Sequence, residues 1–190
     1  MTDITNLSTV NVAISNYIAV VTMNNPPVNA QNRQFHDDLT LAFDVLSDRN
    51  DVRSIVLTGA GKCFSAGADI KGRASQESDL GDHWVHSRRV RECFYSIMEC
   101  RKPVIAAING AALGAGLAVA ASADILIASE SASVGLPEIN VGLLGGGRHA
   151  MRLFSHSKTR RLMLTGQRLS GAELYRLGVV EECVPDDDLM

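Results

Sequence analysis

Hydrophobic residues recur along this chain with two different periods, and each change of period marks a new element. A β-branched run over residues 17–23 predicts the second of two short strands within residues 10–23, with a turn at Ser15 and Asn16 between them. Residues 31–46 then show helical spacing, through Phe35, Leu39, Ala42, Phe43 and Leu46. The pattern therefore predicts a pair of strands followed by an amphipathic helix.

The alternation continues along most of the remaining chain. It predicts strands over residues 53–58, 104–108 and 124–128, and helices over residues 82–100 and 117–121. From residue 148 onward it predicts helical runs, with caps at residues 165–166, 170–173 and 177–178. This order is typical of an α/β fold. The length of 190 residues fits a single domain, covering residues 1–190.

Charge excludes some classes of partner. The formal net charge is −3, from 18 basic and 21 acidic residues, which gives no electrostatic reason to expect nucleic acid or a membrane surface as a partner. We interpret the basic clusters at residues 88–91 and 158–161 as solvated helix faces.

The cysteines and the apolar runs predict that the chain lies in a reducing, aqueous compartment. Its four cysteines show no CxxC pair and no zinc-like grouping with the five histidines, so we expect reduced thiols and no metal. The N-terminus lacks the pattern of a signal peptide. The longest apolar stretch, residues 104–129, is rich in alanine and contains Asp124, so we do not expect it to span a membrane. We predict a cytoplasmic protein.

Two glycine-containing segments, residues 64–71 and 109–116, carry the first candidate chemistry. Each follows a predicted strand, and the second leads into a helix. The N–H groups of Gly114, Ala115 and Gly116 would then be unpaired first-turn donors that favour a negative oxygen. Two such segments could place two N–H groups around one developing oxyanion. The alternative is that small residues merely allow tight packing.

The second candidate is a carboxylate. Glu138 lies between apolar neighbours on both sides, in residues 135–144. Such surroundings tend to raise the pKa of a carboxyl group, so that it can carry protons near neutral pH. The alternative is an ordinary surface carboxylate. An oxyanion site together with Glu138 indicates chemistry beside an activated carbonyl. Ser65 offers a nucleophile instead, but a glycine that the sharp nucleophile turn needs is missing, which favours a turn serine.

Six segments, in order, resemble the crotonase, or enoyl-CoA hydratase/isomerase, superfamily. They are residues 25–30, 55–62, 64–71, 102–110, 135–138 and 177–180. The resemblance implies a spiral of ββα repeats with a helical C-terminal part, and an acyl-CoA thioester as substrate. It implies no further cofactor, since coenzyme A is part of the substrate. It also implies a homotrimer or a hexamer.

The resemblance implies roles for individual residues. The thioester oxygen would lie between the N–H groups of Ala68 and Ala115, with Glu138 as the proton shuttle. The substrate-binding residues that follow from the matched segments are Ser65, Ala66, Asp69, Ile70, Lys71, Leu113, Gly114 and Pro137.

Departures from the family pattern bear on the reaction. Hydratases of the family hold water between two glutamates, and Ala118 stands at the position of the first. One glutamate can still move a proton between two carbons, so the departure favours an isomerase. Ala115 replaces a frequent glycine but keeps its N–H group. His149, in a stretch that is usually made of small residues, could act as a second acid or base. Alternatively it packs against the helix.

Two alternatives to an isomerase stay open. The first is a hydratase or dehydratase that uses Glu138 with another group such as His149. The second is a non-catalytic acyl-CoA-binding protein. Ala118 favours this alternative, and so does the end of the chain at Met190. The family continues beyond this point into further helices, so we expect a truncation there.

Overall fold

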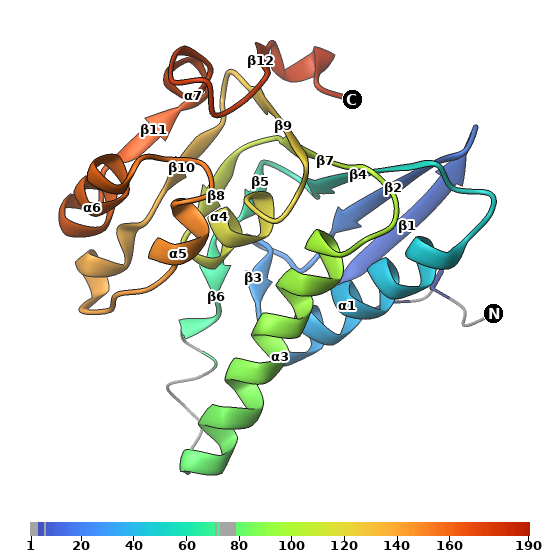
Figure 1. Ribbon diagram of the computed structural model, residues 1–190, viewed down its shortest axis with the longest axis horizontal. Helices are drawn as coiled ribbons and strands as arrows, with labels where there is room; N and C mark the ends of the chain where they lie inside the picture. The colour runs from blue at the N-terminus through green and yellow to red at the C-terminus, as the bar shows by residue number, and fades with distance from the viewer. Residues whose placement is uncertain (1–3, 6, 71, 73–78) are drawn as a thin grey trace.

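A computed structural model describes residues 4–5, 7–70, 72 and 79–190. Its largest sheet has six strands in the order β1-β2-β4-β7-β9-β12 (Figure 1). All neighbours in this sheet are parallel except the hairpin β1–β2. The strands are β1 (Val10–Ser15), β2 (Ile18–Met23), β4 (Ser54–Gly59), β7 (Val104–Ile108), β9 (Ile125–Ser129) and β12 (Glu182–Val184).

Shorter strands form two further sheets. One has the order β11-β10-β8-β5, and the other pairs β3 with β6. These strands are β3 (Ala30–Gln31), β5 (Cys63–Ser65), β6 (Gly67–Ala68), β8 (Ala111–Leu113), β10 (Ser133–Gly135) and β11 (Arg168–Ser170). Three times in succession the chain adds a strand to the large sheet and the next strand to the four-stranded sheet: β4 then β5, β7 then β8, β9 then β10. Helices α3 (Leu80–Met98) and α4 (Ala115–Ala120) close the first two of these units. The predicted α/β spiral of ββα repeats is therefore confirmed.

Helix α1 (Arg33–Asp48) shows why the sequence pattern produces this packing. The side chain of Asn32 caps its first turn by accepting a hydrogen bond from the Phe35 N–H. Its apolar positions are fully buried, and they are Phe35, Leu39, Ala42, Phe43 and Leu46. Burial of each large side chain contributes about 1.5–3 kcal/mol. Helices α1 and α3 lie side by side next to the large sheet in Figure 1.

From residue 137 onward the chain carries helical turns and two short strands. These turns are η1 (Pro137–Val141), α5 (Gly147–Ala150), α6 (His156–Thr165), α7 (Gly171–Arg176) and η2 (Asp186–Asp188). The predicted caps are confirmed: Gly166 ends α6 with a positive φ, the Ser170 hydroxyl accepts from the Glu173 N–H, and Gly178 follows α7 with a positive φ. The helical C-terminal part is therefore confirmed, with β11 and β12 added to it.

The structure corrects some predicted boundaries. Tyr17, expected in the second strand, forms the hairpin turn together with Asn16, both at positive φ, and its ring packs against the Arg53 guanidinium. Gln31, expected to begin a helix, lies in β3 instead. Strands of two or three residues carry too short a pattern to be recognised, which is why β3, β5, β6, β8, β10, β11 and β12 were missed.

Other expectations concern thiols, membranes and metals. All four cysteines are free, as expected. Among the described residues, no helix is long and apolar enough to cross a bilayer. The same residues contain no group of three or more histidine, cysteine or acidic side chains that could hold a metal ion. The predicted cytoplasmic location stays a prediction.

Candidate active site

Three segments far apart in the sequence meet at one edge of the four-stranded sheet. Strands β5, β8 and β10 are parallel neighbours, so their carboxyl ends lie at the same edge. The chain leaves these ends toward Ala68, Ala115 and Glu138. Because the ends of parallel strands are where α/β proteins place their ligands, this edge is the candidate active site.

Strand β6 and the start of α4 approach each other closely. A Cβ on Gly67 would lie 2.5 Å from the carbonyl oxygen of Leu113 and 3.1 Å from the backbone nitrogen of Ala115. Gly67 also has φ +92°, which L side chains rarely adopt. Glycine therefore lets the two segments that carry the predicted N–H donors lie against each other.

The Ala115 N–H group is available to a ligand. It is the first donor of α4, and the first bond within the helix runs from the Ala118 N–H to the Gly114 carbonyl. No hydrogen bond from the Ala115 N–H to another described residue is present. Ala115 is partly exposed, so this donor is not sealed in the core. An unpaired first-turn N–H of this kind favours a negatively charged oxygen.

The carboxyl group of Glu138 lies directly over the residue that precedes this donor. A Cβ on Gly114 would be 2.6 Å from Glu138 Oε1, and Gly114 adopts φ +57° and ψ −117°. Gly146 flanks the same oxygen, because a Cβ there would be 4.0 Å from Oε1. Glycine at these positions leaves room for the carboxyl group beside the Ala115 N–H.

The carboxyl group of Glu138 is poorly solvated. Its Oε2 is buried and has no hydrogen-bond partner among the described residues. Burial raises the pKa of Glu138 above its usual value, and a hydrogen bond from its own backbone opposes this in part. A carboxyl group with an unpartnered oxygen thus lies over the residue that precedes an unpaired N–H group, and a ligand could supply a partner to each.

The chain is similar to known proteins in sequence and in fold. Residues 13–190 match the family model described as Enoyl-CoA hydratase/isomerase. The chain belongs to the enoyl-CoA hydratase/isomerase family. Its fold is accordingly the crotonase fold, and the predicted resemblance is confirmed.

Relatives of the chain include proteins that are named for different activities. A probable enoyl-CoA hydratase of Bacillus subtilis is 36% identical over 184 residues, which cover 95% of this chain and 71% of that protein. A Mycobacterium tuberculosis protein is 37% identical over 173 residues, which cover 90% of this chain and 69% of that protein. Its name describes a hydrolase of a bicyclic carboxyl-CoA. The crystal structure of enoyl-CoA hydratase from Bacillus anthracis aligns with a TM-score of 0.87 at 31% identity, covering 96% of this chain and 72% of that one. The family is thus one of acyl-CoA enzymes, and its reaction differs between members.

The predicted coenzyme A segment continues from β6. Ala66, Ala68 and Ile70 are exposed, whereas Asp69 is partly buried and its Oδ1 accepts a hydrogen bond from the Gly72 N–H at 2.9 Å. Lys71 lies outside the described residues. On the facing segments, Leu113 is buried and Pro137 partly buried beside Glu138. The exposed members of this set can contact a ligand, whereas the Asp69 carboxylate has an internal role in holding the turn.

Among the predicted binding residues that the structure describes, Ser65 has a polar side chain that is fully buried. It is fully buried, its hydroxyl donates to the Asn29 carbonyl at 2.7 Å, and it accepts from Gln31 Nε2 at 3.2 Å. The hydroxyl also accepts from the Gly67 N–H at 3.3 Å. These contacts occupy the hydroxyl and oppose a nucleophilic role, whereas the place of Ser65 in the segment that lines coenzyme A stays a prediction. Ser65 instead holds β6 in place.

His149 packs against a neighbouring helix. Its ring lies edge-on to Phe94 of α3, with the ring centroids 4.7 Å apart, and its Nδ1 is 3.3 Å from Nη1 of Arg152. Burial, and then the charges of Arg152 and Arg148, lower the pKa of His149. Because a guanidinium only donates, Nδ1 is the acceptor and the neutral ring carries its hydrogen on Nε2. These contacts support the packing interpretation.

The structure adds a positioning residue that sequence reasoning passed over. Asn29 is buried at φ +53°, and its Nδ2 donates to the carbonyl oxygens of Ala60, Cys63 and Phe64 at 3.1, 2.7 and 3.2 Å. It therefore ties the segment before α1 to the turn before β6. The available signal was its place in the matched segment 25–30, since asparagine tolerates a positive φ better than most residues.

Proposed function

We propose that this chain is an acyl-CoA isomerase-type enzyme that stabilises a thioester enolate, with Glu138 as the proton shuttle. The thioester oxygen would accept hydrogen bonds from the N–H groups of Ala68 and Ala115. One observation carries the proposal: the Glu138 carboxyl group, whose Oε2 is buried without a partner, lies with its Oε1 over Gly114, the residue that precedes the free N–H of Ala115.

The proposed reaction needs only these groups and the substrate. The Glu138 carboxylate takes a proton from the carbon next to the thioester or one further along the acyl chain. The electron pair of the broken C–H bond moves toward the carbonyl, and the negative charge on oxygen is held by the two N–H groups. Return of the proton to a different carbon shifts the double bond. Loss of one such donor costs about 3 kcal/mol in comparable oxyanion holes.

A position on α4 favours isomerisation over hydration. Ala118 is buried within α4, at the position where hydratases of the family carry their first glutamate. A methyl group cannot activate water. His149, the other candidate for this task, has its Nδ1 taken up by Arg152 and its ring packed on Phe94.

Hydration is the second candidate, because curated relatives of this chain that are 36–37% identical are named as probable enoyl-CoA hydratases. In that case Glu138 would work with a water held by a group other than Ala118. A non-catalytic acyl-CoA-binding protein is the third candidate, and Ala118 is again what favours it.

Mass spectrometry of crotonyl-CoA incubated with the protein in D₂O tests these candidates. Deuterium entering the acyl chain without addition of water supports the proposal. Addition of water supports the hydratase, and Glu138 with a second group would then have to be identified. Binding of the thioester without either change would leave the non-catalytic protein. In every case we propose a cytoplasmic homotrimer or hexamer that needs no metal or redox cofactor.

A further inference from the structure

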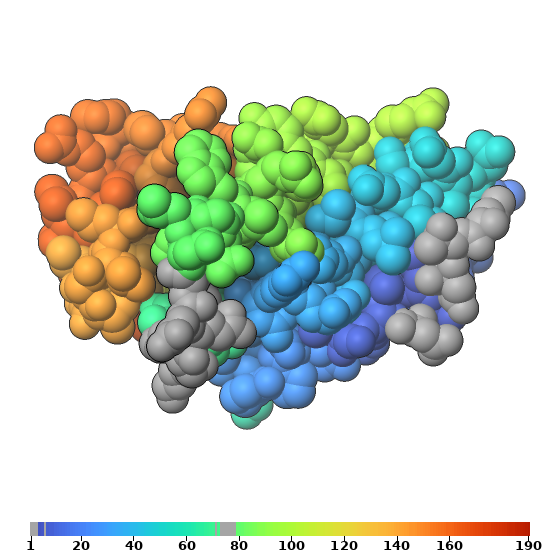
Figure 2. Space-filling view, turned by 90° about the horizontal axis from the view of Figure 1, so that it is seen from below, coloured from blue at the N-terminus to red at the C-terminus, as the bar shows by residue number. Residues whose placement is uncertain are grey.

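A basic pocket lies between α3 and α5, apart from the groups assigned above to the reaction. Its volume is about 410 Å³. Figure 2 shows the green α3 segment beside the orange segment that includes α5 on this face. The lining residues are His86, Ser87, Val90, Arg91, Phe94, Tyr95, Arg148, His149 and Arg152. We call this the α3–α5 pocket. Its walls combine aromatic rings with three guanidinium groups and include no carboxylate.

The three arginines of this pocket differ from their neighbours on the same helices. Arg88 and Arg89 of α3 are paired with Glu92 and Asp37. Arg91, Arg148 and Arg152 form no ion pair with any acidic residue that the structure describes. Three unpaired guanidinium groups around one hollow create a positive potential that an anion would relieve.

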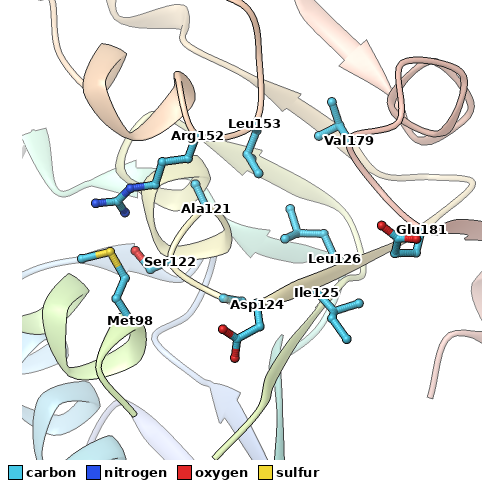
Figure 3. A pocket seen from close by; sticks show the side chains of 11 residues that line it. Met98, Ala121, Ser122, Asp124, Ile125, Leu126, Arg152, Leu153, Val179 and Glu181 are labelled. Carbon is cyan, nitrogen blue, oxygen red and sulfur yellow. The ribbon is translucent and has the colours of Figure 1, made fainter. Parts of the chain in front are cut away.

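A second pocket, in contrast, combines an arginine with acidic side chains. It has a volume of about 320 Å³ and contains the carboxylates of Asp124 and Glu181 (Figure 3). Arg152 also borders it, but Figure 3 shows the guanidinium extending to the side of Met98, away from Glu181. There it donates to His149 Nδ1, which keeps the guanidinium near the α3–α5 pocket.

The α3–α5 pocket begins one helical turn from the candidate active site. Gly146 flanks Glu138 Oε1, and α5 starts at the next residue. Arg148 and His149 therefore follow the glycine that flanks this carboxyl group within one helical turn of the chain. An acyl chain that leaves the thioester past Glu138 would then run toward the start of α5.

We propose that the α3–α5 pocket binds a carboxylate at the far end of the acyl group, so that the preferred substrate is a CoA thioester of a dicarboxylic acid. This inference rests on the proposed function. Arg148, beside Arg91 and Arg152, would pair with the carboxylate, and the rings of Phe94 and Tyr95 would contact the acyl carbons. The phosphates of coenzyme A are a second source of negative charge for the same arginines, and the test separates the two.

The test compares two enoyl-CoA substrates of equal length, one ending in a free carboxylate and the other in its methyl ester. We expect the wild-type chain to favour the free acid by about tenfold or more in kcat/KM, because a guanidinium–carboxylate pair is a strong charge-assisted contact. Arg148→Gln should reduce this ratio about tenfold, and Arg148→Glu should favour the ester. Arg88→Gln, on the same helix as Arg91 but outside the pocket, is the matched control and should leave the ratio unchanged.

Two results would overturn the proposal. One is equal use of both substrates by the wild-type chain. The other is an equal loss for both in Arg148→Gln, which would assign the arginine to the coenzyme A phosphates. Dissociation constants of the two thioesters, measured with Glu138→Gln, give the same comparison without turnover. If the wild-type chain shows no preference for the free acid but still exchanges deuterium into crotonyl-CoA, the dicarboxylate proposal is rejected and the proposed function stands.

Discussion

At the scale of single residues, Glu138 is both a partly buried carboxyl group and the proposed base. One of its carboxyl oxygens is buried without a partner, and burial raises its pKa above the ordinary 4.5. The apolar neighbours in the sequence do not supply this burial, because Ile139 and Leu144 are exposed; the carboxyl group instead packs against Gly114 and Gly146. Such a base lowers the stability of the folded chain, because its charged form is poorly solvated.

Glu138→Gln should lower kcat by about 10²-fold or more while acyl-CoA binding persists, because an amide cannot accept the proton. In the parent chain, activity should fall as pH drops through the raised pKa of Glu138, since protonation removes the base. The acid limb of the pH–rate profile should therefore lie above pH 4.5. Glu182→Gln, at an exposed carboxylate of β12, is the control. Unchanged turnover in Glu138→Gln would rule out its proposed role.

The raised pKa also makes a prediction about stability. A carboxyl group whose pKa is higher in the folded state destabilises the fold above that pKa, and this cost disappears below the pKa of the unfolded chain. Glu138→Gln should thus raise the free energy of unfolding at pH 7, with the gain vanishing in acid. Urea unfolding at pH 7 and at acidic pH checks this. A loss of stability at pH 7 would contradict it.

Gly114→Ala should disturb the same carboxyl group from the other side. The new Cβ would lie 2.6 Å from Glu138 Oε1, and the backbone at φ +57° and ψ −117° suits glycine alone. We expect a loss of about 1–3 kcal/mol in stability and of at least about tenfold in kcat. Gly61→Ala is the matched control, because its φ is also positive at +70° but no atom lies within 4 Å of the new Cβ. It should cost about 1 kcal/mol and leave kcat unchanged.

At the scale of elements, short strands do more for the site than the long helices. Strand β6 has two residues, yet it brings Gly67 against the start of α4. Its position depends on buried polar side chains, those of Asn29 and Ser65, which take the place of a longer ladder of backbone hydrogen bonds.

Asn29→Ala should therefore cost about 3 kcal/mol or more, because one buried and two partly buried carbonyl oxygens lose a donor and alanine disfavours φ +53°. It should also lower kcat, since β6 would no longer be fixed. Asn32→Ala, which removes only the N-cap of α1, should cost about 1 kcal/mol without loss of kcat. Equal effects of the two substitutions, in thermal unfolding and in turnover, would argue against a positioning role for Asn29.

At the scale of the whole molecule, apolar residues stay exposed next to the site. Val141, Leu144 and Leu164 are 59%, 64% and 63% exposed, and helix α6 packs beside η1. Exposed apolar side chains gathered in one region favour association. They supply a driving force for the trimer or hexamer that the family resemblance implies.

Sedimentation velocity should accordingly give three or six times the chain mass of 20.4 kDa. Leu144→Lys should shift the sample toward the monomer, because it places a charge among these side chains. Tyr175→Lys, at an exposed aromatic residue of α7, should leave the distribution unchanged. A parent chain that sediments as a monomer at micromolar concentration would contradict this prediction.

The sequence by itself determined the alternation of elements, the α/β class and the identity of the chemical groups. Period and composition are local properties, so the core of α1, the strand β7 and the caps at Gly166 and Ser170 could be read from neighbouring residues. The matched segments also pointed to Glu138 and to the two glycine segments without reference to the fold. These inferences needed no knowledge of which strands pair.

Only the tertiary structure decided which of these groups meet. The register of β5, β8 and β10 brings Ala68, Ala115 and Glu138 to one edge, and strand pairing over such distances leaves no trace in local periodicity. The same reason explains why Ser65 proved to be internal and why His149 packs on Phe94. It also explains the unpaired arginines between α3 and α5, since their lack of acidic partners depends on how the two helices pack.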